Sequence, residues 1–150
     1  MRSETRLYRA GKCDVNWPVL FGMQLVAEFP EFVWSRTPEQ ALAAIHQSIC
    51  ENQRHEIVVW DDSGTHLGTA IVVQEDDMHV GHCLSVQWRF VHPEHRGVAG
   101  SALQRRVIAL ARELDISVIA YTKCIGLARY ELRYNRVRRH NGKEDQKDVG

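Results

Sequence analysis

Residues 90–103 read Phe90-Val91-His92-Pro93-Glu94-His95-Arg96-Gly97-Val98-Ala99-Gly100-Ser101-Ala102-Leu103. The first residues end an apolar strand, Pro93 stops it, and a helix with small residues in its first turn follows. Free N–H groups and the positive end of the helix dipole meet at such a junction, so it predicts an anion site that suits a pyrophosphate. A plain strand-to-helix connection, with glycines that only turn the chain, is the alternative. The dinucleotide fingerprint G-x-G-x-x-G is absent.

The flanking residues place this junction in a βαβ unit. Residues 80–91 predict a long strand, and the residues expected on one of its faces are Leu84, Val86, Trp88 and Phe90. Apolar residues at helical spacing over 103–114 predict an amphipathic helix, and residues 116–121 predict a buried strand directly after it. Because a strand, a helix and a second strand in this order form a crossover connection, we expect the two strands to be parallel.

The other segments complete an α+β fold. The predicted elements are a strand over 7–10, a helix over 17–30 capped by Asn16, a helix after the capping box of residues 37–40, a hairpin of residues 56–60 and 67–73 around the turn 61–64, a loop over 75–77 and a strand over 130–137. The order β-α-α-β-β-β-α-β-β predicts a mixed sheet with helices on both faces. We expect one domain over residues 4–137 and a polar, flexible tail over 138–150.

Composition limits the classes of protein to consider. The chain has 150 residues, 44% of them hydrophobic, and a mean hydropathy of −0.35, as expected for a globular domain. It shows neither a signal peptide nor an apolar run that could span a membrane. The four cysteines have no C-x-x-C spacing, so we expect free thiols and a cytoplasmic location rather than disulfides or a zinc knuckle.

Charge is distributed unevenly along the chain. Residues 1–95 hold 7 Lys and Arg against 13 Asp and Glu, a net charge of −6, whereas residues 96–139 hold 10 against 3, a net charge of +7. A basic region of this kind suits a phosphate-bearing cofactor or an acidic partner, although a solvated surface that pairs with the acidic half would look the same. Nucleic-acid binding is disfavoured, because it rests only on the arginines interleaved with Tyr130 and Tyr134.

The junction resembles the acetyl-CoA-binding motif of the GNAT superfamily of acyl-CoA N-acyltransferases. The residues that carry the resemblance are Val91, Pro93, Arg96, Gly97, Val98, Ala99 and Gly100, and the order of elements fits that fold as well. The resemblance implies that the backbone of Phe90 and Val91 binds pantetheine. It also implies a set of residues that holds the phosphates: Arg96, Gly97, Val98, Ala99, Gly100 and Ser101.

Three features depart from the family pattern. Only Gly97 stands where the family has Gly-x-Gly, and the helix that usually follows the strand ending at Tyr121 is replaced by a further strand. The strand before the loop offers no carboxylate as a base. Tyr121 and Tyr130 are the candidate acids for the leaving thiolate, with Tyr134 a further one, and Glu56 or Glu75 would assist through water.

Two functions follow from these residues. The first is an acetyl-CoA-dependent N-acetyltransferase acting on an unidentified amine, either a small molecule or a protein. The second is a catalytically inactive protein of the same fold, similar to small GNAT-like proteins of tailed phages, some of which are virion parts with protein partners. No metal is expected, because His79 and His82 would point to opposite faces of a strand and His92 and His95 flank Pro93.

Overall fold

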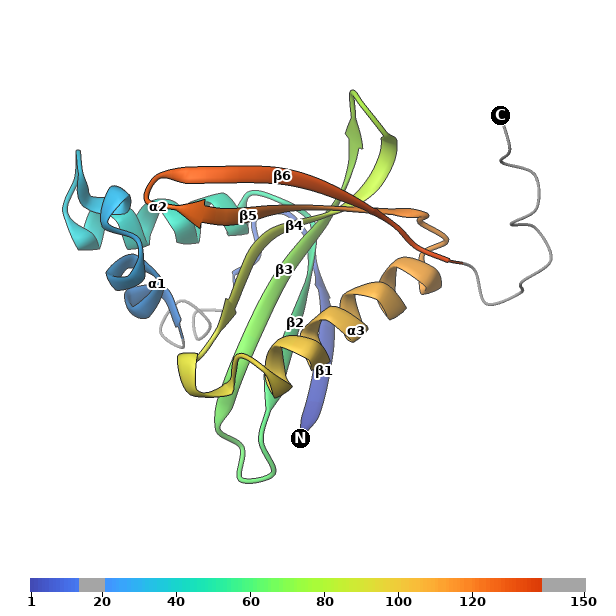
Figure 1. The fold of residues 1–150 in the computed structure, drawn as a ribbon, viewed down its shortest axis with the longest axis horizontal. Coiled ribbons are helices and arrows are strands. Elements are labelled where there is room, and N and C mark those ends of the chain that lie inside the picture. The colour runs from blue at the N-terminus through green and yellow to red at the C-terminus, as the bar shows by residue number, and fades with distance from the viewer. Residues whose placement is uncertain (14–20, 139–150) are drawn as a thin grey trace.

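The computed structural model describes residues 1–13 and 21–138, which form a six-stranded sheet with helices on both sides (Figure 1). In chain order the elements are β1 (Arg2–Tyr8), α1 (Met23–Glu28), η2 (Pro30–Val33), α2 (Pro38–Cys50), β2 (Arg54–Trp60), β3 (His66–Asp77), β4 (Gly81–Val91), η3 (Pro93–His95), α3 (Val98–Glu113), β5 (Val118–Gly126) and β6 (Arg129–Arg136). The strands lie in the sheet in chain order. All neighbours are antiparallel except β4 and β5, which are parallel, as the βαβ unit predicts.

Two apolar cores lie on opposite faces of the sheet. One contains α3 together with sheet residues such as Ile57, Leu84 and Ile119. The other contains α1 and α2 together with Ile71 and Phe90. Helices therefore cover both faces, and the predicted α+β fold with a mixed sheet is confirmed.

The capping box predicted at residues 37–40 starts α2. The backbone N–H of Gln40 donates to Thr37 Oγ1 at 3.2 Å, and the backbone N–H of Thr37 donates to Gln40 Oε1 at 2.9 Å. Pro38 occupies the first helical position, where the missing N–H costs nothing. These local bonds begin the helix whose buried side chains, Ala41, Ile45 and Ile49, form part of the second core.

A β-bulge in β4 corrects the predicted face of that strand. Trp88 pairs with Ile71 and Val86 pairs with Val72, so Gln87 is an extra residue without a partner on β3. An extra residue reverses the alternation of side chains beyond it. Leu84 and Val86 therefore pack toward α3, whereas Trp88 and Phe90 pack toward α1 and α2, and the four do not share one face.

The parallel strands separate immediately after the bulge. β4 pairs with β5 only over Leu84–Val86 and Ile119–Tyr121. Beyond these residues β4 continues along β3 while β5 continues along β6, so the two strands diverge (Figure 1). The edge of β4 from Gln87 to Val91 therefore has no partner on β5, and an opening forms between the two strands.

Several boundaries differ from the predictions. Residues 75–77 belong to β3, because pairing with β4 continues as far as Asp77 and Gly81. β1 begins at Arg2 rather than at residue 7, and α3 begins at Val98, five residues before the apolar spacing over 103–114 that predicts it. The predicted cap Asn16 and residues 139–150 of the predicted tail lie outside the described residues.

β5 and β6 form a hairpin with no helix between them. Leu127 and Ala128 join the strands, and Ala128 has a φ of 52°, which closes the tight turn. β5 thus leads directly into a further strand, as the sequence predicts. Among the described residues, no helix has the length and apolarity needed to cross a membrane.

The prediction that all four cysteines are free thiols is wrong. Cys13 and Cys50 form a disulfide with a Cα–Cα distance of 5.3 Å, whereas Cys83 and Cys124 are free. The two bonded residues are 37 positions apart, so no local spacing reveals the pair. They meet because the end of α2 lies beside the chain that leaves β1, where the N–H of Gly11 donates to the carbonyl of Cys50 at 2.7 Å.

A buried histidine makes the fold sensitive to acid. His66 is only 7% exposed and contacts His92 at 3.0 Å and Thr69 at 2.6 Å through its two ring nitrogens. Burial, with the nearby His92, lowers the pKa of His66 to about 4. The unfolded chain therefore binds a proton that the folded chain excludes, and stability falls as the pH drops from about 6.5 toward 4.

We expect the free energy of unfolding to fall by about 2–3 kcal/mol between pH 7 and about pH 4.5 on account of His66. Urea denaturation of the wild type and of His66→Gln at both pH values measures it. The variant should lose markedly less stability on acidification than the wild type. Equal losses would mean that other groups control the acid response.

Candidate active-site cleft

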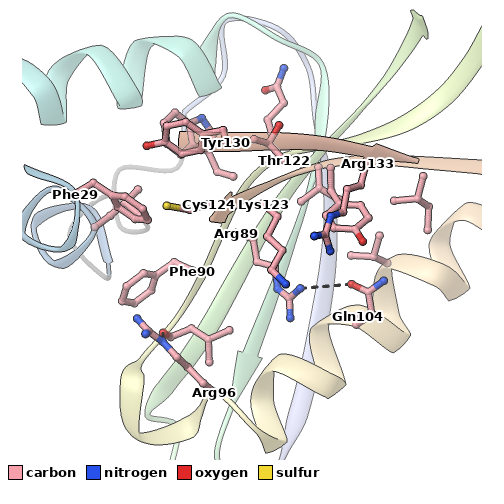
Figure 2. Close-up of a pocket in the computed structure, with 18 of the residues that line it drawn as sticks. Phe29, Arg89, Phe90, Arg96, Gln104, Thr122, Lys123, Cys124, Tyr130 and Arg133 are labelled. Atoms are coloured by element: carbon pink, nitrogen blue, oxygen red, sulfur yellow. Dashed lines mark hydrogen bonds between the residues drawn. The ribbon is translucent and has the colours of Figure 1, made fainter. Parts of the chain in front are cut away.

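A cleft of about 940 Å³ occupies the opening between β4 and β5. Figure 2 shows side chains from both strands, β6, α3 and the segment around η2 converging on it. Phe29 and Tyr130 lie at one end, Arg89 and Arg133 lie toward Gln104 of α3, and Arg96 lies next to Phe90. The divergence of the strands after Val86 and Tyr121 creates this space, and the bulge at Gln87 decides which β4 side chains reach each end.

Basic side chains form the wall on the α3 face. Arg89, Lys123 and Arg133 line the cleft together with Gln104 of α3 (Figure 2). Arg89 donates to two neutral oxygens, the carbonyl of Gly100 at 2.9 Å and Oε1 of Gln104 at 3.5 Å. Burial lowers the pKa of Arg89, but a guanidinium remains charged at neutral pH. The arrangement leaves positive charge available for an anion.

The start of α3 lies next to this wall. Gly97 is its N-cap and no side chain caps the first N–H groups. A Cβ on Gly97 would meet no atom within 4 Å, so the space above this backbone is open. Val98 and Ser101 are exposed, whereas Ala99 and Gly100 are buried and present only their backbone. An open helix N-terminus beside Arg89 can hold a phosphate group.

The other predicted cofactor residues lie at the end of β4. Phe90 and Val91 pair with Thr69 and Gly68 of β3. The ring of Phe90 is buried, with its centroid 5.4 Å from that of Phe21, so Phe90 can offer only backbone groups to a ligand.

Arg96 lines the cleft at the start of α3. It forms an ion pair with Glu28 of α1, and its Nε donates to the carbonyl of Val91 at 3.4 Å. Of the predicted cofactor residues, the structure places Phe90, Val91 and Arg96 along the cleft, whereas residues 97–101 at the start of α3 do not line it.

Aromatic side chains form the opposite wall. Phe29 stacks on Phe32 with ring centroids 5.3 Å apart, and Phe32 meets the edge of Trp88 at 6.2 Å. Glu31, between Phe29 and Phe32 in the sequence, accepts a hydrogen bond from the hydroxyl of Tyr130. Burial and the neighbouring Glu31 raise the pKa of Tyr130, so this hydroxyl keeps its proton at neutral pH.

The two predicted catalytic tyrosines lie on different faces of the β5–β6 hairpin. Tyr121 lies two residues after Ile119, which packs against α3, so it faces α3, whereas Tyr130 faces η2. Both line the cleft. Tyr134 does not line it, because its hydroxyl donates to Asp77 at 3.0 Å on the far side of β4.

The carboxylates suggested by sequence lie elsewhere. Glu56 is buried in β2, where Arg54 Nε donates to it at 2.8 Å, and Glu75 is exposed near the end of β3. Glu31 lines the cleft in their place.

Sequence reasoning missed Glu31, Arg89, Gln104, Lys123 and Arg133. The excess of basic residues after position 96 indicated part of this set, but nothing in the sequence marks the bulge that directs Arg89 toward α3.

Comparisons with known proteins agree with this architecture. The model of the Acetyltransferase (GNAT) family matches residues 21–135. A putative acetyl transferase from Pyrococcus furiosus has a similar structure, with a TM-score of 0.60, 16% identity, and coverage of 83% of this chain and 84% of that one.

Two further structures are similar. The ribosomal-protein-alanine N-acetyltransferase from Brucella melitensis has a TM-score of 0.53 and 18% identity, over 81% of each chain. A predicted acetyltransferase with acetyl-CoA from Clostridium acetobutylicum has a TM-score of 0.55 and 14% identity, over 83% of this chain and 82% of that one. At these identities the structures establish the fold alone.

A search of curated proteins by sequence found no match. Because the family model covers most of its length, the chain belongs to the GNAT acetyltransferase family.

Proposed function

We propose that this protein transfers an acetyl group from acetyl-CoA to a primary amine. The observation that carries the proposal is the cleft itself, with a basic wall and an open helix N-terminus on one face of the sheet and an aromatic wall with a carboxylate on the other. The two walls meet where β4 and β5 diverge, so a ligand on one face can reach a ligand on the other through the gap.

The α3 face fits the nucleotide end of acetyl-CoA. Diphosphate oxygens would accept from the first N–H groups of α3 over Gly97 and from the guanidinium of Arg89. The unpaired edge of β4 from Gln87 to Val91 offers backbone groups to the amides of pantetheine. Acetyl-CoA supplies a thioester with an electrophilic carbonyl carbon and a thiolate leaving group.

The aromatic wall fits the acceptor. An ammonium group would be attracted to the Glu31 carboxylate and to the faces of Phe29, Phe32 and Trp88, while an apolar body would fill the rest of this end. Some structural neighbours are named for amine substrates, among them an aminoglycoside 6'-N-acetyltransferase from Acinetobacter haemolyticus. For this chain we propose a cationic amine with an aromatic or apolar body, either a small molecule or an exposed amine of a protein.

Glu31 and Tyr130 supply the proton transfers. Glu31 accepts a proton from the ammonium group, either directly or through water, and leaves a nucleophilic amine. As the C–N bond forms and the C–S bond breaks, Tyr130 can donate its proton to the departing sulfur and recover one from Glu31. Glu31, ionised again, then accepts the second proton from the acylated nitrogen and releases it to solvent, which leaves the neutral amide and the free thiol. Tyr121 lies beside Arg133 on the cofactor side and is the second candidate acid.

A non-catalytic role as a structural component, in a phage virion or another assembly, is the alternative. None of the comparisons supports this alternative. It would explain the shortened loop at Gly97 and the direct connection from β5 to β6. It predicts that the cleft binds no acetyl-CoA.

Calorimetric titration with acetyl-CoA tests the cofactor site. Arg89→Gln should weaken binding about tenfold, since it removes a charged donor to phosphate. Gly97→Leu should weaken binding as well, because its side chain would fill space that is open in the free protein. Glu31→Gln, in the aromatic wall, serves as the matched control and should bind acetyl-CoA as the wild type does. Absence of binding to the wild type at about millimolar acetyl-CoA would contradict the proposal and favour the structural role.

Thiol release from acetyl-CoA in the presence of 2-phenylethylamine tests the catalytic assignment. Tyr130→Phe should lower kcat roughly a hundredfold with little change in KM for acetyl-CoA, as expected for the loss of a general acid. Glu31→Gln should raise KM for this cationic amine. A loss of kcat in Tyr121→Phe but not in Tyr130→Phe would instead assign the acid to the cofactor side.

A further inference from the structure

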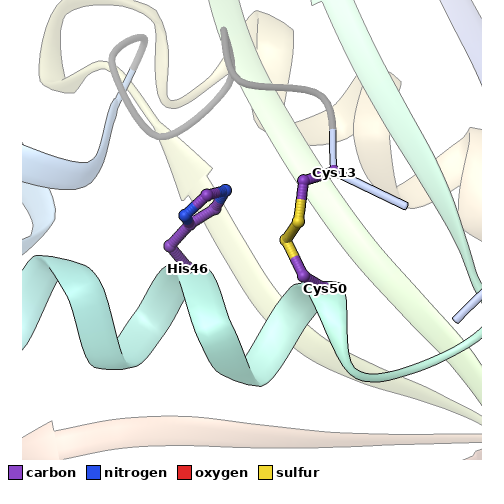
Figure 3. Close-up of side chains that lie close together, drawn as sticks. All are labelled: Cys13, His46 and Cys50. Atoms are coloured by element: carbon purple, nitrogen blue, oxygen red, sulfur yellow. A yellow bond between two sulfur atoms is a disulfide. The ribbon is translucent and has the colours of Figure 1, made fainter. Parts of the chain in front are cut away.

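Three side chains of types that can ligate a metal lie together near the end of α2, away from the cleft (Figure 3). Cys13 follows β1, and His46 and Cys50 stand one turn apart on the same face of α2. One ring nitrogen of His46 and the sulfur atoms of both cysteines all lie within 4.8 Å of one another. In the described protein the two sulfurs are bonded as a disulfide.

Reduction of this disulfide would leave the donor set of a zinc site. Thiolates and imidazoles are ligands that Zn²⁺ prefers. From the zinc–ligand bond lengths, ligand atoms in a tetrahedral site lie about 3.6 Å apart, so small side-chain movements from the observed spacing of at most 4.8 Å would form the site. The hydrogen bond from Gly11 to the carbonyl of Cys50 holds the segment beside α2 by its backbone, so Cys13 stays close when the sulfurs separate. Cys13 is exposed, which gives a reductant access to the disulfide.

We propose that Cys13, His46 and Cys50 form a redox-controlled site for Zn²⁺. A dithiol reduces the disulfide, its own two thiols becoming a disulfide as the S–S bond accepts two electrons and two protons. Zn²⁺ then displaces the two thiol protons and binds both sulfurs and the imidazole, with water as the fourth ligand. The oxidised protein has no thiolates here and does not bind the ion.

This proposal is independent of the acetyl-transfer chemistry. The other two cysteines are in different surroundings, since Cys83 is fully buried in β4 and Cys124 lines the cleft. Cys124 therefore serves as the control cysteine.

Titration of the reduced protein with Co²⁺ tests the site. Tetrahedral cobalt bound to thiolates gives visible d–d bands and a thiolate-to-cobalt charge-transfer band, which Zn²⁺ should abolish by displacement. We expect saturation at one Co²⁺ per chain, no bands from Cys50→Ser or from the oxidised protein, and an affinity lowered roughly tenfold or more in His46→Ala. Cys124→Ser should behave as the wild type does.

Three results would overturn the proposal: reduced wild type without these bands at stoichiometric Co²⁺, equal bands from Cys50→Ser, or loss of the bands in Cys124→Ser. Circular dichroism identifies a variant that fails to fold. Protection of the wild-type Cys13 and Cys50 thiols from alkylation by Zn²⁺, mapped by mass spectrometry, provides a readout that needs no variant.

A second observation concerns the free edge of the sheet. β6 is an edge strand of eight residues, and Tyr130 and Leu132 on it are 46% and 57% exposed. In the described part of the chain nothing pairs with its outer side. A long exposed edge with apolar side chains is able to pair with another strand.

The sequence of β6 is complementary to itself in the antiparallel direction. Residues 130–134 read Tyr130-Glu131-Leu132-Arg133-Tyr134. Antiparallel pairing of two copies about Leu132 sets Leu132 opposite Leu132, Glu131 opposite Arg133, and Tyr130 opposite Tyr134. Glu131 already pairs with Arg133 at 2.8 Å within the strand, so two copies would bring four charges of alternating sign together.

From this pairing we infer that β6 is a dimer interface that joins two copies of this chain into a continuous sheet. Sedimentation analysis of the wild type should show a dimer. Glu131→Arg and Arg133→Glu should each give monomers, because like charges then face each other, and the double variant Glu131→Arg/Arg133→Glu should restore the dimer. A monomeric wild type, dimeric single variants or a monomeric double variant would each refute this interface.

Discussion

The loss of pairing between β4 and β5 is the constraint on which the rest of this structure depends. The two strands share only three residue pairs and then follow different neighbours, β3 on one side and β6 on the other. If β4 and β5 stayed paired along their full length, the sheet would be continuous and no cleft would form between them. The divergence produces a cleft that passes through the sheet, with the apolar cores of both faces beside it.

The bulge at Gln87 gives the two ends of this cleft different chemistry. By reversing the alternation of β4, it directs Arg89 toward α3 and Trp88 toward η2. Positive charge and an open helix N-terminus thus lie on one face, and aromatic rings with Glu31 on the other. Under the proposed function, the basic wall would attract the phosphates of acetyl-CoA and the Glu31 carboxylate would attract a cationic amine, so the two ligands would approach from opposite faces of the sheet.

The direct hairpin of β5 and β6 also has a consequence for the surface. Leu127 and Ala128 return the chain directly from β5 into β6. The second strand of the hairpin then ends the sheet, with Leu132 exposed on it and with Tyr130 and Arg133 lining the cleft. The same short strand therefore contributes to the cleft and to the free edge.

The sequence by itself determined the elements and their order, because helix caps, apolar periodicity and turn residues act over a few positions. The capping box at Thr37, the parallel connection through α3 and the strand-to-helix junction at residues 91–98 could all be predicted in this way. Only the tertiary structure decided the bulge at Gln87, the cleft-lining Glu31 and the disulfide between Cys13 and Cys50. Each of these depends on which distant segments pack together, and a linear pattern does not encode the distance between residues that are far apart in the chain.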